Sequence, residues 1–291
     1  MADLKYESPE TTEAAVALLA AGGQMARVFA GGTDLLVQMH EEMIEPTLLV
    51  DIKNIKETRE ITFESDYVRI GAAVTGAELG ENDKLIAMWP GVVEAVELIG
   101  SYQVQGRATI AGNLCNASPA ADSVPAMIAA GAIVCIAGPN GTREIPVEQM
   151  LVSPGKTSLA QGEFVTSILL PNRPSSAGDA YLRFIPRTEM DIAVVGAGVS
   201  IELNADGTCA SARLALGAVS ATAQLVEAAS SILVGNKLDD RVLEALAAAA
   251  SDACSPIDDK RGTIEFRTKV AGVLACRAAK IAWQRAEKTN G

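Results

Sequence analysis

The stretch Phe29-Ala30-Gly31-Gly32-Thr33-Asp34-Leu35-Leu36 is one of two glycine-bearing stretches around which we expect the N-terminal part of this chain to be organised. The short run 27–30 before the glycines is mainly apolar and bounded by turn residues, which predicts a buried strand. Glycine adopts backbone angles closed to other residues and carries no side chain, so Gly31-Gly32 predicts a tight turn. Thr33 and Asp34 suit the N-cap of a following helix. The exposed N–H groups of such a turn favour the binding of a phosphate. An ordinary strand–turn–helix corner that binds no ligand has the same sequence pattern.

A second stretch repeats this chemistry further along the chain. Thr109-Ile110-Ala111-Gly112-Asn113-Leu114 is followed by Asn116, Ser118-Pro119 and Asp122. These polar side chains lie between an apolar helix predicted at 92–99 and the apolar run 127–130, so burying them costs free energy unless each forms a hydrogen bond. Backbone groups of the protein could supply those bonds. Two such loops in one domain nevertheless favour a long cofactor with a central pyrophosphate.

Composition and charge limit the classes of protein that this chain can represent. Its 291 residues favour two domains, and 49% hydrophobic but only 4% aromatic residues predict an aliphatic core. The net charge of −12 argues against nucleic acid or an anionic membrane as a partner. We find neither a signal peptide nor an apolar run of the roughly 20 residues that a membrane span needs, and expect a cytoplasmic protein.

Cysteine and histidine usage argues against a metal centre within the chain. The cysteines are five in number and none are paired at CxxC spacing: Cys115, Cys135, Cys209, Cys254 and Cys276. They are most simply explained as small buried hydrophobes. His40 is the only histidine, which also disfavours a Ser–His–Asp triad.

The order of predicted elements indicates an α+β protein. Residues 1–55 and 56–174 form two α/β subunits, with Ser8-Pro9 beginning the first helix and a linker at 172–178. Beyond the linker, the predicted strands occupy 180–185, 191–203 and 208–218, and the predicted helices occupy 222–230, 239–253 and 263–285. We therefore expect a three-stranded antiparallel sheet covered by helices on one face.

The two glycine-bearing loops resemble those of the FAD-binding medium subunit of the molybdenum hydroxylases, the family of xanthine dehydrogenase and carbon monoxide dehydrogenase. The resemblance extends to 155–163, to Arg187 with 191–193, and to Phe266-Arg267. The chain departs from the family pattern by Gln105 and Ala108, where an Arg and a Gly are usual, and by Ala111 in place of the first Gly of a pair.

The resemblance implies a fold and a cofactor. Residues 1–174 would form an FAD-binding domain of the vanillyl-alcohol-oxidase type, and residues 177–286 a C-terminal domain of the CO dehydrogenase flavoprotein type. The diphosphate of FAD would lie on the first loop, Asp122 would bind the flavin hydroxyl chain, and Arg183 would lie near the isoalloxazine edge. A helix cap for Asp34 and a structural ion pair for Arg183 stay open as alternatives. The candidate cofactor-binding residues are Phe29, Ala30, Gly31, Gly32, Thr33, Asp34, Leu35, Ala108, Thr109, Ala111, Gly112, Asn113, Cys115, Asn116, Asp122, Val165 and Arg183.

The resemblance also implies a role in electron transfer without a catalytic acid or base in this chain. Electrons would reach FAD from [2Fe-2S] clusters in a small subunit, after hydroxylation of a substrate at molybdopterin-bound molybdenum in a large subunit. The assembly would be a dimer of heterotrimers. Two alternatives remain: a stand-alone FAD oxidoreductase of the same fold, and a non-flavin scaffold that kept the fold.

Overall fold

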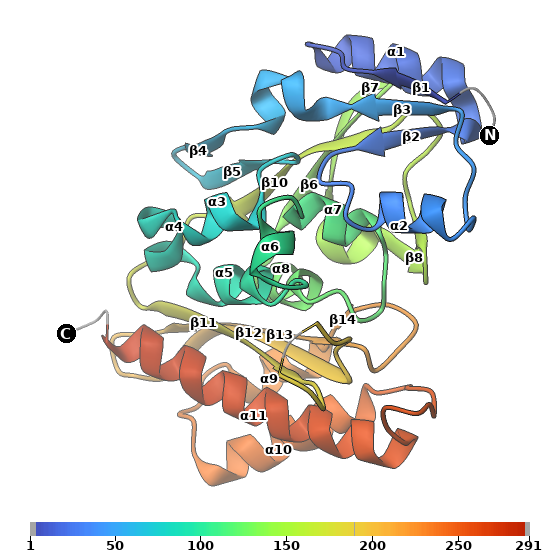
Figure 1. Cartoon of the computed structure of the whole chain (residues 1–291). Helices are drawn as coiled ribbons and strands as arrows, with labels where there is room; N and C mark the ends of the chain where they lie inside the picture. Colours follow the sequence, from blue (N-terminus) through green and yellow to red (C-terminus); the bar gives the residue numbers. More distant parts are fainter. Residues whose placement is uncertain (1–3, 189, 289–291) are drawn as a thin grey trace.

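The computed structural model describes residues 4–188 and 190–288, so the first three residues of the predicted N-terminal domain and Glu189 of the predicted C-terminal domain lie outside the described part. Figure 1 shows two blocks stacked on each other, with the N-terminal elements above and a sheet backed by helices below. Two hydrophobic clusters form the core, one in each block. Helix and strand are mixed throughout, in agreement with the predicted α+β class.

A three-stranded parallel sheet in the order β1–β3–β2 carries the first loop. Its strands are β1 (Lys5–Glu7), β2 (Ala26–Phe29) and β3 (Leu48–Asp51), connected by α1 (Thr12–Gly22) and α2 (Leu35–His40). The prediction that α1 begins at Ser8-Pro9 is wrong. Thr11 caps the helix by accepting a bond from the N–H of Ala14, because the Ser8 hydroxyl is engaged by the Asn54 amide, 3.0 Å away.

The second subunit is built on a five-stranded antiparallel sheet in the order β4–β5–β10–β6–β7. Its strands are β4 (Ile61–Phe63), β5 (Tyr67–Gly71), β6 (Ile133–Gly138), β7 (Gly141–Pro146) and β10 (Phe164–Pro171), and a small hairpin adds β8 (Leu151–Ser153) and β9 (Lys156–Thr157). Strand β10 is central because its run of apolar residues is buried on both faces of the sheet.

Six short helices connect β5 to β6 and place the second loop. They are α3 (Gly76–Gly80), α4 (Asp83–Met88), α5 (Pro90–Glu97), α6 (Tyr102–Gln105), α7 (Ile110–Cys115) and α8 (Ser123–Ala130). Helix α8 is buried along its whole length, since every residue in it is apolar or small. It ends at Gly131 in the left-handed conformation typical of a helix C-terminus. Single 3₁₀ turns occur at Gly23–Met25, Ile52–Asn54, Lys56–Thr58 and Val147–Gln149.

The C-terminal sheet has four antiparallel strands, one more than predicted. They are β11 (Ala177–Phe184), β12 (Val195–Leu203), β13 (Cys209–Gly217) and β14 (Gln224–Leu225). The extra strand β14 lies in the segment predicted to begin a helix; its backbone pairs with β13, and helix α9 (Glu227–Leu233) starts only after it. Two residues are too few to show a period of two in the sequence. Helices α10 (Asp240–Asp252) and α11 (Ile264–Lys288) follow near their predicted positions.

Both faces of the C-terminal sheet are covered, whereas the sequence predicted helices on one face. Figure 1 shows α9, α10 and α11 beneath the sheet and α5 and α8 of the N-terminal block above it. The approach to α8 is close, because a Cβ added to Gly198 would lie 2.6 Å from the Pro125 carbonyl oxygen. Arg285 of α11 crosses to Glu94 of α5 and strengthens this contact between the blocks.

Candidate functional site

The first loop presents a row of unpaired backbone donors. Within the described part of the chain, the N–H groups from Gly31 to Leu35 donate to no other protein group. Helical bonding begins with the N–H of Leu36, which donates to the Gly32 carbonyl at 3.0 Å. Consecutive N–H groups that converge at the start of a helix form a concave site for an anion, and phosphate oxygens fit such a site.

Contact between the two loops requires glycine at Gly31. A Cβ added there would lie 2.1 Å from the carbonyl oxygen of Arg107 and 3.1 Å from the Cα of Ala108. The neighbouring Gly32 has φ +73°, a conformation that side chains disfavour, and a Cβ there would meet the Phe29 ring at 2.4 Å. Each glycine is thus required for its own steric reason, and at Gly31 the backbones of the two segments approach each other directly.

An N-cap at Thr109 fixes where α7, the helix of the second loop, begins. The Thr109 hydroxyl accepts a bond from the N–H of Gly112 at 2.9 Å, as its position before the helix leads one to expect. The Asn113 side chain turns toward α8, where its oxygen accepts bonds from the N–H and hydroxyl of Ser123. One further N–H group, that of Ala111, donates to no protein group in the described residues, whereas Thr109 pairs with Thr75 in an antiparallel bridge.

A chain of side-chain hydrogen bonds joins the two loops. The Asn116 amide donates to the Asp34 carboxylate at 3.1 Å and accepts from the Gln38 amide at 3.1 Å. Asp34 therefore interacts with the second loop rather than capping α2 with its side chain, and burial raises the pKa of its carboxyl. Asn116 was predicted at the site, but Gln38 was not, because nothing in the sequence sets it apart from an ordinary helix residue.

We expect Asn116→Ala to weaken FAD binding about tenfold and to lower the free energy of unfolding by about 1–2 kcal/mol, because it leaves Asp34 and Gln38 without their shared partner. Fluorescence titration with FAD and urea unfolding would measure the two effects. The matching double-mutant cycle with Asp34→Ala should give a non-additive result, since the two residues are in direct contact. Full additivity would show that this hydrogen bond does not hold the loops together.

A cavity of about 430 Å³ lies between the two loops. That volume is within the range of small-molecule sites. All of the candidate cofactor-binding residues except Phe29, Asp122 and Arg183 line it. Lining residues that were not predicted are Arg27, Val28, Gln38, Ile44, Ile52, Ala72, Ile99, Gly155, Leu159 and Phe164. Two of these, Gly155 and Leu159, belong to the stretch 155–163 that carries part of the family resemblance. That motif was the sequence signal that could have predicted them as lining residues.

The three remaining candidates do not line the cavity. Phe29 lies beneath the first loop, with the Lys53 ammonium 4.1 Å from its ring centroid. Asp122 and Arg183 form an ion pair of 2.7 Å at the boundary between the two blocks. The structural ion pair that the sequence left open for Arg183 is therefore present, and its partner is Asp122.

The Asp122–Arg183 pair is buried, and each side chain has a further hydrogen-bond partner. The side chains are only 10% and 6% exposed, and Asp122 also accepts a bond from the Tyr181 hydroxyl at 3.0 Å. Arg183 donates a second bond to the Leu98 carbonyl at 2.9 Å. Burial raises the pKa of the Asp122 carboxyl to about 6, although Arg183 and Tyr181 act in the opposite direction. A carboxyl from the first block is thus held by two side chains of β11.

Cys115 faces the cavity as an unreactive thiol. Burial raises its pKa to about 12, so the thiolate that redox or metal chemistry needs is not formed near neutral pH. In the described residues, no cluster of three or more His, Cys, Asp or Glu side chains could hold a metal ion. None of the described helices is long and apolar enough to cross a membrane.

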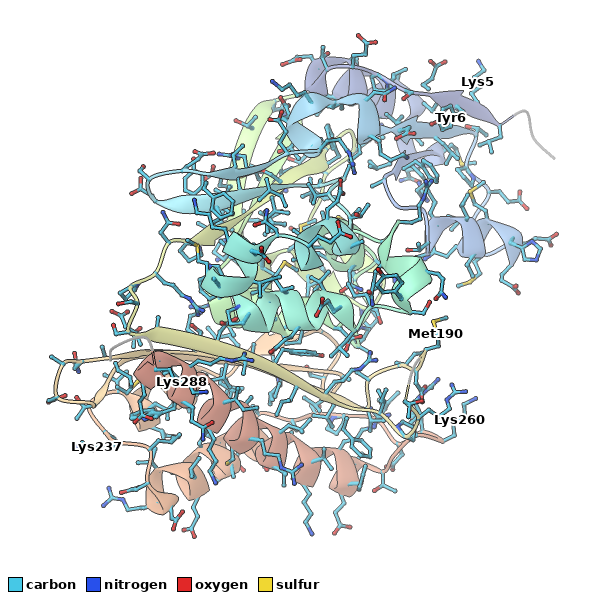
Figure 2. All side chains as sticks on the ribbon, turned by 60° about the vertical axis from the view of Figure 1, so that its left-hand side comes forward. Lys5, Tyr6, Met190, Lys237, Lys260 and Lys288 are labelled. Atoms are coloured by element: carbon cyan, nitrogen blue, oxygen red, sulfur yellow. The ribbon has the colours of Figure 1, made fainter. Side chains whose placement is uncertain are left out.

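A second ionic cluster holds the loop between β11 and β12. Asp191 accepts from Arg187 at 3.2 Å and lies 3.8 Å from Arg261, which comes from the segment before α11. Figure 2 accordingly shows Met190 and Lys260, from these two segments, near each other at one end of the C-terminal sheet, with Lys237 and Lys288 at the other end. Arg187 and Asp191, which carry part of the family resemblance, therefore form an ion pair.

The donors of this site match the groups of a dinucleotide cofactor. Free N–H groups on both loops suit phosphate oxygens, and the aliphatic lining suits an uncharged ring system. The fold and the site therefore define a protein that binds a phosphate-bearing organic cofactor.

Comparison with known proteins specifies the family. Residues 2–173 match the model described as the FAD binding domain in molybdopterin dehydrogenase, and residues 180–282 match the CO dehydrogenase flavoprotein C-terminal domain. The carbon monoxide dehydrogenase medium chain of Hydrogenophaga pseudoflava is 33% identical, with 97% of each chain covered. The putative xanthine dehydrogenase FAD-binding subunit of Escherichia coli is 32% identical, with 90% of each chain covered.

Comparison with solved structures points to the same family. A chain of the CO dehydrogenase from Oligotropha carboxidovorans superposes with a TM-score of 0.93 at 34% identity, covering 97% of this chain and 98% of that one. The chain belongs to the family of FAD-binding medium subunits of the molybdenum hydroxylases, which are oxidoreductases. The family resemblance stated from the two loops is confirmed.

Proposed function

We propose that this chain holds FAD between its two loops and passes electrons from iron–sulfur clusters to an external acceptor. The observation that carries the proposal is the run of free N–H groups from Gly31 to Leu35 at the wall of the cavity. These donors would bind the diphosphate, and the N–H group of Ala111 would bind a further polar group of the cofactor. When bound, FAD supplies the electron-transfer chemistry, and the protein positions it and adjusts its potential.

The residues around the cavity position the cofactor and exclude water. Gly31 allows the two loops to touch, and the Asp34–Asn116–Gln38 chain keeps them in register. Asp122, held by Arg183, would present its remaining acceptor capacity to the flavin hydroxyl chain, while Arg183 would place a cation near the isoalloxazine edge. No residue of this chain is required as a general acid or base.

We further propose the assembly and architecture that the resemblance implies. A large subunit would carry molybdopterin, a small subunit would carry [2Fe-2S] clusters, and the complex would be a cytoplasmic dimer of heterotrimers. The names of the two relatives described above support a multi-subunit enzyme, since one is called a medium chain and the other an FAD-binding subunit. Residues 1–174 would form the FAD-binding domain of the vanillyl-alcohol-oxidase type, and residues 177–286 the second domain. The limits of the two matching family models, at 173 and 180, support this division.

The test is a visible spectrum of the chain purified after co-expression with its genomic neighbours, followed by acid release of the cofactor. We expect one non-covalent FAD per chain, together with molybdenum and iron in co-purifying subunits. FAD without any partner would favour the stand-alone flavoenzyme. A colourless protein that rejects added FAD in both preparations would contradict both flavin functions and favour the scaffold.

A further inference from the structure

Helix α2 has an apolar outer face. Leu36 and Val37 are 50% and 56% exposed, and Met43, just beyond the helix, is 71% exposed. The N–H of Met43 donates to the Gln38 carbonyl at 2.9 Å, which keeps Met43 against the end of α2. We call Leu36, Val37 and Met43 the outer patch. A surface helix ordinarily turns polar residues to water, so the outer patch is a candidate interaction site.

The opposite face of the same helix belongs to the cofactor cavity. Leu35 and Gln38 line the cavity, as does Ile44 beyond the helix. Helix α2 is thus a single layer between the cavity and the outside, and Figure 1 shows it at the outer edge of the N-terminal block. Its apolar outer residues are not needed for the inner contacts, so the inner face does not explain them.

Exposed acidic residues lie beside Met43 of the outer patch in the sequence. Glu41, Glu42 and Glu45 are exposed, and within the described part of the chain none of the three forms an ion pair. No lysine or arginine occurs between Arg27 and Lys53 in the sequence. An apolar centre with a negative rim is complementary to a surface that has an apolar centre and a positive rim.

We propose that the outer patch is the docking surface for another subunit of the assembly, one whose contacting face is apolar at its centre and rich in lysine and arginine at its rim. The proposal rests on the heteromeric function proposed above. A second copy of this chain is a poorer occupant, because a twofold contact would place the acidic rim against itself. The partner would also hold α2 in place, and with it the first loop at its N-terminal end.

The experiment uses the co-expressed complex, purified through a tag on this chain at about 0.15 M salt. Val37→Asp and Met43→Glu place a charge in the apolar centre and should lower the amount of co-purified partner at least about tenfold. Val273→Asp is the matched control, since Val273 is an exposed valine (42%) on α11, and it should leave the partner at the wild-type level. The amount of co-purified partner should also fall in the triple variant Glu41→Lys, Glu42→Lys, Glu45→Lys, because these substitutions reverse the charge of the rim.

FAD content per chain and a thermal melt are measured on every variant, so that loss of docking is distinguished from loss of the fold or of the flavin site. Loss of partner with FAD and melting temperature retained supports the proposal. Full partner content in Val37→Asp and Met43→Glu would overturn it. A homodimer of the wild-type chain that Val37→Asp dissociates, with the heteromer intact, would also overturn it. A wild-type chain that binds FAD but never co-purifies with a partner would overturn the heteromeric function itself.

Discussion

The variant Gly31→Ala should lose at least about a hundredfold in FAD affinity and about 3 kcal/mol in the free energy of unfolding. The added Cβ would lie 2.1 Å from the oxygen and 2.8 Å from the carbon of the Arg107 carbonyl, far inside any real contact. Both atoms belong to the backbone, so no side-chain rotation can relieve the clash. The loops must separate, and the cavity that lies between them must change shape. Fluorescence titration with FAD and urea unfolding would measure the two losses.

Gly106→Ala is the matched control for this substitution. Gly106 lies one residue before Arg107, has an ordinary negative φ of −66°, and a Cβ there meets nothing closer than 3.7 Å. The FAD affinity of Gly106→Ala should equal that of the wild type, and its free energy of unfolding should change by less than about 1 kcal/mol. If Gly31→Ala behaved like Gly106→Ala, the close approach of the two loops would not be needed for the cofactor site.

The second large effect is expected for Arg183→Met, at about 3–5 kcal/mol of lost stability near neutral pH. The substitution removes the cation from the buried Asp122 carboxylate and keeps much of the apolar volume. Arg187→Met is the control, because Arg187 also bonds an aspartate but its side chain is 70% exposed, so its loss should destabilise the protein far less than Arg183→Met does. Equal effects of the two substitutions would contradict a special role for the buried pair.

The pH dependence of the stability loss in Arg183→Met tests whether Asp122 is the group responsible. Its folded pKa, raised to about 6 by burial, exceeds the unfolded value of about 3.9, so its contribution to stability is lost as pH rises between these values. Without Arg183 the folded pKa should rise further, and the loss should extend above pH 6. Arg183→Met should therefore be more destabilised relative to wild type at pH 8 than at pH 5. Adding Asp122→Asn should remove most of that difference, and its persistence would assign the effect to another group.

Several features of the site could be predicted because they depend on local backbone chemistry. Gly31-Gly32 and the Thr109 cap are short-range signals, and the structure contains the turn and the helix that they indicate. The wrong predictions were made where a distant segment decides the outcome. Ser8 does not cap α1 because Asn54 engages its hydroxyl, and β14 forms because β13 offers a free edge.

The amino-acid sequence by itself determined the α+β class, the two glycine-bearing loops and the family, since each follows from residues close together in the chain. Only the tertiary structure decided that Asn116 bonds Asp34 and Gln38, that Arg183 pairs with Asp122, and that α2 separates the cavity from an apolar outer patch. Asn116 and Asp34 are 82 positions apart, and Arg183 and Asp122 are 61 apart. Contacts at such separations depend on how whole elements pack, because no local spacing specifies which side chains will meet.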